Sequence, residues 1–394
     1  MKKILYCSLV LLFFVLIIIS CSKKSDVASP VADSNPPAGT ATATDTGVVN
    51  TFTQTATVTE TGTTTETSTV TDTATNTPTY TMTNTFTNTA TNTPNATQTV
   101  QAQMTFVAGL SHTSLTSVPN GTFTQQNTSG QSFQHTISSF KIGQYEVTYE
   151  LWYYVRQWAL NNGYTFANAG REGKSGTIGA VPAGKQPVTT INWRDMIVWC
   201  NAYSQMMQLT PVYYSDAGFT NPIKDSTDGA YGNSLNSTPG SFDNPYVNWN
   251  ANGYRLLTEG EWQYAASYID GTNWTPYNYA AGDSAPYDTS TTLGNYCWYS
   301  VNSGSTTHNV GEKVPTALSL YDMSGNVWEM CWDWWAYYPS SAQNNYRGLD
   351  TGVVRIMKSA GYNLGNSLMQ IGGRNSNDPY TENNTIGFRI GRSN

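Results

Sequence analysis

The sequence predicts one large folded domain of the mixed α+β class, with much irregular backbone, after a long unfolded N-terminal segment. From Phe106 onward aromatic residues are concentrated, and glycine, proline and asparagine interrupt short apolar segments. About 280 residues follow, which is enough for a single domain with a substantial core. Apolar stripes at helical spacing and short alternating runs both occur in this part, so helices and strands should be mixed.

Residues 1–20 have the features of a bacterial lipoprotein signal peptide. Two lysines precede an apolar run at residues 9–19 that is too short for a comfortable membrane-spanning helix. The small Ser20 then precedes Cys21, as in a lipobox, which implies cleavage before Cys21 and acylation of its thiol. An uncleaved N-terminal anchor is the alternative. In either case the rest of the chain is exported and tied to the cell envelope, at the outer membrane or the cell surface.

Residues 21–104 are rich in threonine, with asparagine, alanine, proline and glycine between. Such a segment cannot bury enough apolar area to offset the entropy of ordering its backbone, so we expect a disordered tether. Its near-alternation of threonine does not predict a strand, because the alternating partners are mostly small or polar. The tether should hold the domain of residues 105–394 away from the membrane, and its hydroxyl groups are candidate O-glycan sites.

Three helices of the domain are marked by their N-terminal caps. Thr148 precedes one apolar stripe, Asn192 with Asp195 precedes a second, and Thr258 with Glu261 forms a capping box before a third. Residues 133–140 and 142–147 read as short strands, and residues 385–390 as a buried closing strand. Residues 215–250 are polar and glycine-rich and should form a long surface insertion.

Arg255 and Glu259 raise the question of a catalytic pair at the start of the third helix. We expect instead that they form a buried or half-buried ion pair that fixes this helix. No phosphate-binding glycine loop or basic patch occurs, and the net charge of −7 disfavours nucleic acid as a partner. The three histidines lie far apart in the sequence with no carboxylate at ligand spacing, which argues against a histidine metal site.

Residues 321–335 combine four tryptophans with three carboxylates and a Gly-Asn turn pair, so core and site should meet there. An extended chain after Gly325 would turn the carbonyl groups of Gly325 and Val327 and the side chain of Glu329 to one side, with Asp322 closing the turn. This all-oxygen set suits Ca²⁺. The alternative is an ordinary turn followed by Glu329 as a hydrogen-bonded carboxylate at the core edge.

The Gly-Asn-Val-Trp-Glu sequence at residues 325–329 resembles the signature of the formylglycine-generating enzyme family, also called the sulfatase-modifying factor family. Residues 209–214 and 254–266 resemble further segments of that family. The resemblance covers the whole globular part and implies a variant of the C-type lectin fold. It also implies a structural calcium ion at the positions of Asp322, Gly325, Val327 and Glu329.

The enzymes of this family oxidise a cysteine of a sulfatase with O₂ and a copper ion held by two cysteine thiolates five positions apart. The matching positions here are Leu364 and Met369, and no cysteine follows Cys331. Because these side chains supply no thiolate for copper, the sequence predicts neither copper nor formylglycine generation. Cys200 should be a core thiol, whereas Cys297 and Cys331 either pair or both stay buried.

The C-terminal stretch of residues 362–384 is rich in asparagine, serine, glycine and tyrosine, the residues that adaptable binding surfaces use. It resembles the variable region of diversity-generating retroelement proteins, and a plain polar loop is the alternative. We predict that a ligand surface is formed by Trp328, Tyr362, Asn363, Leu364, Asn366, Met369, Arg374, Asn375, Asn377 and Tyr380.

The predicted function is therefore that of a lipid-anchored module that binds or displays and does not catalyse, with a protein or glycan as ligand. A surface receptor diversified by a retroelement is one rival. An enzyme of the same family with an altered, copper-independent activity is the other. The missing cysteine pair argues against copper chemistry but leaves the second rival open.

Overall fold

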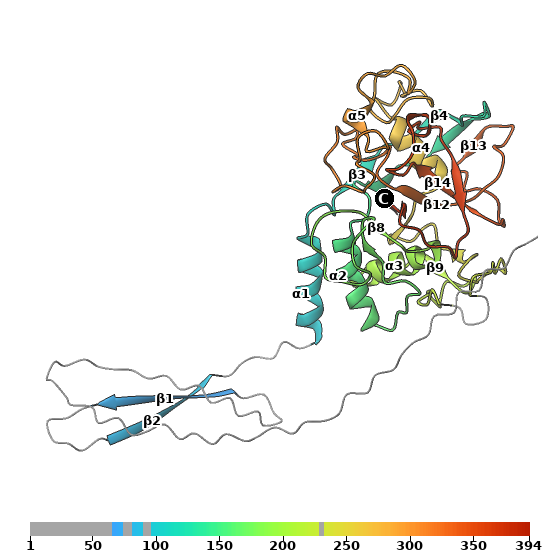
Figure 1. Ribbon diagram of the computed structural model, residues 1–394. Coiled ribbons are helices and arrows are strands. Elements are labelled where there is room, and N and C mark those ends of the chain that lie inside the picture. Colours follow the sequence, from blue (N-terminus) through green and yellow to red (C-terminus); the bar gives the residue numbers. More distant parts are fainter. Residues whose placement is uncertain (1–64, 74–80, 90–95, 228–231) are drawn as a thin grey trace, which may run out of the picture. The chain divides into compact units, whose positions relative to one another are not determined.

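The computed structural model describes residues 65–73, 81–89, 96–227 and 232–394. The chain divides into two compact units, Met1–Thr93 and Pro94–Asn394, and each is considered by itself (Figure 1). The predicted signal peptide and Cys21 lie outside the described residues. None of the helices in the described ranges is both long and apolar enough to cross a bilayer.

The first unit contains an antiparallel pair of strands, β1 (Thr65–Thr73) and β2 (Thr81–Thr89), in register from Thr65 opposite Thr89 to Thr73 opposite Thr81. The prediction of a wholly disordered tether is therefore wrong over these two segments. Threonine is β-branched and favours extended backbone. Pairing also gives partners to backbone N–H and C=O groups along the two strands.

The second unit begins earlier than residue 105, because helix α1 (Ala96–Ala108) spans the predicted boundary. Val107 near the end of α1 is buried, and the ring of Phe106 meets that of Tyr154 edge-on at 4.8 Å between centroids. Tyr154 belongs to the next helix, α2 (Tyr149–Leu160). The last turns of α1 thus pack on the folded unit and extend it toward the N-terminus.

The predicted helix caps are confirmed. Thr148 accepts a hydrogen bond from the backbone N–H of Leu151 at the start of α2. Capping boxes of Asn192 with Asp195 and of Thr258 with Glu261 begin α3 (Trp193–Met206) and α4 (Glu259–Ser267). Two shorter helical turns are α5 (Leu293–Tyr296) and η1 (Asn366–Leu368). Each cap satisfies backbone N–H groups that the first helical turn leaves without partners.

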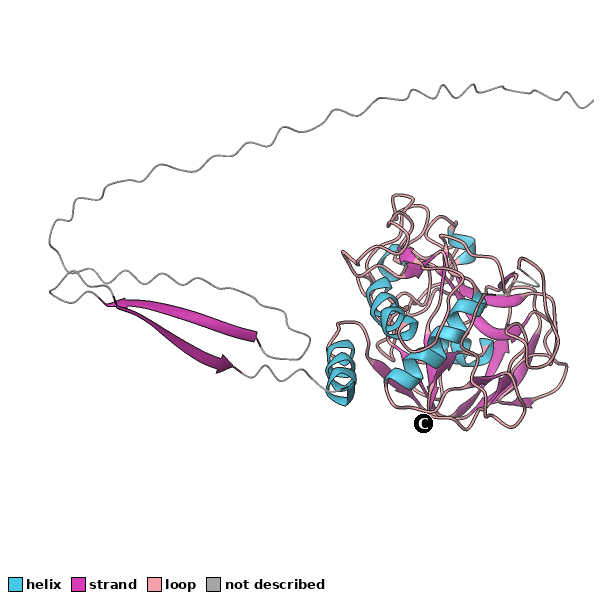
Figure 2. Cartoon of the chain, turned by 90° about the horizontal axis from the view of Figure 1, so that it is seen from below, coloured by secondary structure: helices cyan, strands magenta, loops and turns pink. Residues whose placement is uncertain are grey.

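The strands of this unit are short and form several small sheets (Figure 2). Two sheets have four strands, in the orders β11-β17-β6-β3 and β15-β14-β12-β16, and a third has the order β13-β5-β4. The pairs β7-β8 and β10-β9 complete the set. The bounds are β3 Leu115–Val118, β4 Gly121–Gln126, β5 Ser132–Ile137, β6 Phe140–Gly143, β7 Arg171–Glu172, β8 Val188–Thr189, β9 Tyr213–Tyr214, β10 Tyr246–Val247, β11 Tyr254–Leu256, β12 Trp328–Trp334, β13 Gln343–Asn344, β14 Arg355–Ser359, β15 Asn375–Asn377, β16 Ile386–Gly387 and β17 Ile390–Ser393.

The predicted strands of residues 133–140 and 142–147 are placed differently. β5 ends at Ile137, and Phe140 already belongs to β6, which pairs with β17 in another sheet. Ser138 and Ser139 therefore form the corner between two sheets. The prediction of an α+β domain with much irregular backbone is confirmed.

The core is built from tryptophans on two helices and from strand β12. Trp152 of α2 and Trp199 of α3 stack with 5.8 Å between ring centroids, and Phe388 meets both edge-on. All seven residues of β12 are buried, including the charged Glu329 and Asp333. This strand therefore carries carboxylates into the interior and defines the first candidate site.

Candidate functional site

A tight turn leads into β12, and the predicted calcium ligands lie in this turn and at the start of the strand. Asp322 and Asn326 have positive φ angles of 56° and 61°, and Gly325 between them has 89°. A Cβ on Gly325 would lie 2.4 Å from the carbonyl oxygen of Trp298, so only glycine fits this close approach. The turn is buried and therefore needs internal partners for its polar groups.

Glu329 forms a buried ion pair with Arg389, with 2.7 Å between Oε1 and Nη2. The indole N–H of Trp262 donates to the other carboxylate oxygen, Oε2, at 2.8 Å. Both residues of the pair are about 1% exposed. The negative charge of Glu329 is thus balanced by Arg389, and its oxygens are hydrogen-bonded within the protein, as the alternative to a calcium ligand expected. A cation bound here would have to share the carboxylate with Arg389.

Asp322 is the carboxylate with capacity left for a cation. Its Oδ2 accepts the backbone N–H of Gly311 at 2.7 Å, whereas Oδ1 is buried with no hydrogen-bond partner among the described residues. Burial raises the pKa of Asp322 to about 6. It also raises the pKa of the neighbouring Glu146 well above its usual value, and the charges of Asp322 and Glu329 raise it further.

These carboxylates share one nearby guanidinium, so the cluster lacks positive charge when all are ionised, and the free Oδ1 of Asp322 fits a hard cation. No group of three or more His, Cys, Asp or Glu side chains in the described ranges is arranged to hold a metal. An ion here would therefore depend on backbone carbonyls such as that of Gly325, which already accepts the Ser359 hydroxyl at 3.0 Å. Calcium at Asp322, Gly325, Val327 and Glu329 stays a prediction.

The positions matched to the copper cysteines carry packed apolar side chains. Met369 is fully buried, and Leu364 is partly buried against the main core. The carbonyl of Met369 accepts the hydroxyl of buried Ser324 at 3.0 Å. Among the described residues, Cys200, Cys297 and Cys331 are all buried and unpaired. Burial raises the thiol pKa of each, to about 12 for Cys297, so these groups stay protonated and unreactive near neutral pH.

The expected ion pair of Arg255 with Glu259 is wrong in its partners. Arg255 pairs with Glu261: its Nη1 lies 2.7 Å from Oε2 of the carboxylate, and its Nη2 lies 2.7 Å from Oε1. Glu259 instead pairs with Arg374 at 2.7 Å and lies 3.7 Å from Lys358. The capping box turns Glu261 back toward β11, where Arg255 lies, so the pair serves the helix terminus as expected.

The predicted ligand surface is only partly at the surface. Trp328, Tyr362 and Met369 are buried, so the prediction is wrong for these three as contact residues. Arg374 is 9% exposed in its side chain and is held by Glu259. Leu364, Asn377 and Tyr380 are half-buried, and Asn363, Asn366 and Asn375 are exposed. Tyr362 and Met369 lie inside the fold, whereas Leu368 and three of the asparagines stay exposed.

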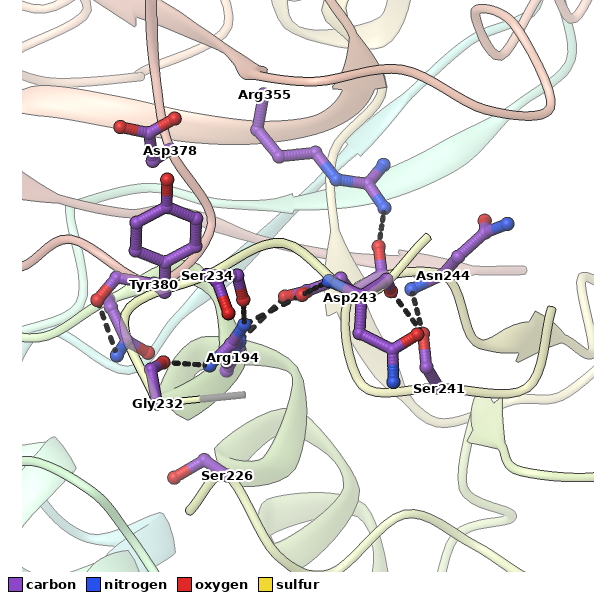
Figure 3. Close-up of polar contacts among 12 residues, drawn as sticks. Arg194, Ser226, Gly232, Ser234, Ser241, Asp243, Asn244, Arg355, Asp378 and Tyr380 are labelled. Atoms are coloured by element: carbon purple, nitrogen blue, oxygen red, sulfur yellow. Dashed lines mark hydrogen bonds and ion pairs between the residues drawn. The ribbon is translucent and has the colours of Figure 1, made fainter. Parts of the chain in front are cut away.

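The insertion of residues 215–250 is anchored in the interior and is not only a surface loop. Arg194 of α3 pairs with Asp243, with 2.6 Å between Nε and Oδ1, and both side chains are almost completely buried. The same guanidinium donates to the carbonyls of Gly232 and Ser234 at 2.8 and 2.7 Å. The carbonyl of Asp243 accepts a hydrogen bond from Arg355 of β14 (Figure 3).

Arg194 also joins the insertion to the C-terminal stretch. Its guanidinium carbon lies 4.6 Å from the ring centroid of Phe242 and 5.4 Å from that of Tyr380, and Figure 3 shows Tyr380 beside this arginine. The backbone N–H of Arg194 donates to the carbonyl of Pro379 at 3.3 Å. In the sequence, the only indication of this contact was an arginine within a largely apolar helix. A buried arginine needs an acidic partner, which is Asp243 here.

Two curated relatives match part of this chain. The "Chaperone protein LppX" of Paenibacillus barcinonensis is 31% identical over 265 residues, which is 61% of this chain and 82% of that protein. The formylglycine-generating enzyme of Streptomyces coelicolor is 31% identical over 160 residues, covering 36% of this chain. The match spans 48% of that enzyme, about half of its length.

Solved structures share the fold. Variable protein 1 of Treponema denticola is 29% identical, with a TM-score of 0.56 over 71% of this chain and 95% of that one. A protein named CarF, 24% identical, has a TM-score of 0.53 over 72% of this chain and 98% of its own. The Sulfatase-modifying factor enzyme 1-like domain matches residues 76–394. Because that match covers most of the chain and agrees with the resemblance of residues 254–266 and 325–329, the protein belongs to the sulfatase-modifying factor family.

Proposed function

We propose that the protein is an exported, lipid-anchored module whose sulfatase-modifying-factor domain binds a protein or glycan ligand and does not oxidise cysteine. The observation that carries the proposal is the identity of the two positions that would hold copper. Leu364 and the fully buried Met369 have no thiolate to offer a soft metal ion. The buried, protonated thiols elsewhere in the domain do not replace them.

The binding surface that we propose is composite. Asn363, Asn366 and Asn375 supply exposed amides, and the insertion is joined to the C-terminal stretch through Arg194. Amide side chains offer both donors and acceptors and can adapt to different partners. A buried, ion-paired base below exposed amides is an arrangement that lets a surface vary without loss of the fold. Calcium at Asp322 would stiffen this base.

The lipid anchor at Cys21 belongs to the same proposal. The relative from Paenibacillus carries the name of a chaperone, and the fold neighbour from Treponema carries the name of a variable protein. Both names are consistent with a role in binding. A location at the cell envelope, with the threonine-rich segment between lipid and domain, follows from the lipobox-like sequence before Cys21.

Binding can be tested with the full mature chain on arrays of surface glycans and of exported proteins. The double variant Asn363→Ala with Asn366→Ala should lose the strongest signals, because it removes exposed amides of the proposed surface. Asn344→Ala, an exposed asparagine on β13, is the matched control and should bind as the wild type does. Equal binding by all three proteins would contradict this location of the surface.

Diversification by a retroelement is a second candidate, and the similarity to variable protein 1 of Treponema denticola favours it. It predicts that isolates of the source organism differ mainly at asparagine codons of residues 362–384. Sequencing this gene from several isolates provides the test. Differences spread evenly along the domain would argue against it.

A further inference from the structure

A polar cavity lies away from the C-terminal stretch, between β5, β11 and the loop after β13. Its volume is about 330 Å³, and its lining includes Ser138, Trp249, Asn250, Asn345 and Arg347. A second cavity of about 420 Å³ shares Trp249 and Arg347 and adds the aromatic side chains of Tyr246 and Trp332. Both volumes fall in the range of small-molecule sites. None of these residues belongs to the ligand surface predicted from the sequence.

Arg347 stands between the two cavities as a positive charge without an acidic partner. Its guanidinium carbon lies 4.0 Å from the centroid of the Trp249 indole ring. It makes no hydrogen bond or ion pair with any residue of the described ranges, and its side chain is exposed. Stacking on an indole fixes the guanidinium plane while its N–H groups stay available at the edge of that plane.

The other charges around the first cavity do not neutralise Arg347. Arg255 and Glu261, which also line it, are already paired with each other. The guanidinium carbon of Arg255 lies 5.3 Å from the Trp249 ring, so two cations share this indole. The Nε of Arg255 is buried without a partner among the described residues. Asp350 lines the second cavity and is exposed, with no ion pair in that same part of the chain.

The frame around these groups is rigid. The hydroxyl of Ser393 donates to the carbonyl of Trp249 at 3.2 Å. Asn345 donates from its amide to the Ser138 hydroxyl at 2.9 Å and accepts the Ser138 backbone N–H at 2.8 Å. The N–H of Tyr346 donates to Nε2 of His135 at 2.8 Å. Burial lowers the pKa of His135 to about 4, so this imidazole is neutral and can accept the bond.

We propose that these two cavities bind an acidic sugar, with the carboxylate of a uronic acid on Arg347 and the sugar hydroxyls on Ser138, Asn250 and Asn345. A planar guanidinium matches a carboxylate with two parallel hydrogen bonds. Hydroxyl and amide groups suit a polyol, and the half-buried Tyr246 offers an apolar face for a neighbouring sugar ring. A simple inorganic anion would leave most of either cavity unfilled. This site goes beyond the proposed function and uses none of its surface residues.

Titration calorimetry with the full chain tests the site using glucuronate, glucose, cyclohexanecarboxylate and inorganic phosphate as probes. Glucuronate should bind at least about tenfold more tightly than each of the others, because only it supplies both the carboxylate and the hydroxyls. Arg347→Gln should reduce glucuronate binding to the level of glucose, and Arg347→Lys should give an intermediate value, since lysine keeps the charge and loses the planar fork. Lys224→Gln, which removes the same charge elsewhere in the domain, should change nothing.

Because Arg347 is exposed and makes no hydrogen bond in the described residues, its variants should fold, and an unchanged melting temperature verifies this. The proposal is overturned if glucuronate does not bind, or if Arg347→Gln binds it as the wild type does. Equal binding of cyclohexanecarboxylate or phosphate would show an unspecific anion site and would also overturn it. These results do not depend on Asn363 or Asn366, so failure here leaves the proposed binding surface untouched.

Discussion

Replacing Asp322 by asparagine should change the stability of the domain in opposite directions with and without calcium. The side chain is 2% exposed, and its Oδ1 has no hydrogen-bond partner in the described part of the chain. Asparagine keeps an oxygen that can accept the Gly311 N–H and removes the negative charge. The variant therefore separates the cost of an unpaired buried charge from the benefit of a bound cation.

Without calcium, the expected change in the free energy of unfolding follows from the pKa of Asp322, which burial raises from 3.8 to about 6. This pKa difference corresponds to roughly 3 kcal/mol between the charged and neutral forms of the carboxyl. Because the folded-state pKa is the higher one, the cost grows as pH rises from about 4 to about 6 and is fully present above about pH 6. In chelator near neutral pH, Asp322→Asn should therefore be more stable than wild type by up to about 3 kcal/mol.

With calcium in excess, the order should reverse. A ligand that binds only the folded state stabilises it by about 4.1 kcal/mol at a thousandfold excess over its dissociation constant, which exceeds the roughly 3 kcal/mol that the charge costs in chelator. The variant has lost a ligand oxygen with its charge and gains less from the ion. Urea unfolding of both proteins, with chelator and with calcium, measures the effect. If wild type and variant respond identically to calcium and chelator, and elemental analysis of the purified protein finds no calcium, the ion is absent and Asp322 is a strained buried acid.

Three further outcomes are expected. Glu329→Gln should destabilise the protein by about 3–5 kcal/mol in chelator, because it leaves Arg389 as an unpaired buried charge, and by more with calcium, because a predicted ligand is lost as well; a loss seen only with calcium would contradict the ion pair. Arg194→Met should cost about the same by leaving Asp243 unpaired, and limited proteolysis should then cut residues 232–244 faster; unchanged cleavage would show that the insertion is held otherwise. Labelled palmitate fed to cells should enter the wild type but not Cys21→Ala, and equal labelling would rule out the lipid anchor.

Local signals predicted much of the fold, because helix caps act within a few residues. Thr258 and Glu261 meet across one helical turn, so their spacing in the sequence is already their spacing in space. The turn before β12 is also set locally, because the positive φ and close approach at Gly325 require glycine. The resemblance to a known family then predicted how these elements are arranged in space, because the spacing of residues in the sequence does not predict that arrangement.

Long-range partners were the part that sequence reasoning placed wrongly. Glu259 stands four residues from Arg255, yet its partner is Arg374, 115 positions later. Arg194 and Asp243 are likewise 49 positions apart. A buried charge selects its partner by geometry across sheets, and neither periodicity nor composition encodes that geometry. The β1–β2 pair was missed for another reason, because threonine alternates there with mostly small or polar residues, which leaves no apolar pattern to detect.

The central claim is that this domain binds a ligand and does not oxidise cysteine. A mass-spectrometric assay of a sulfatase-motif peptide tests it most directly. The full chain is incubated with the peptide, copper and O₂, beside an active formylglycine-generating enzyme as positive control. With Leu364 and Met369 in place of the two thiolates, the peptide cysteine should keep its mass, as it does without protein. Conversion to the aldehyde well above the protein-free control would contradict the account and show that another group of this domain performs the oxidation.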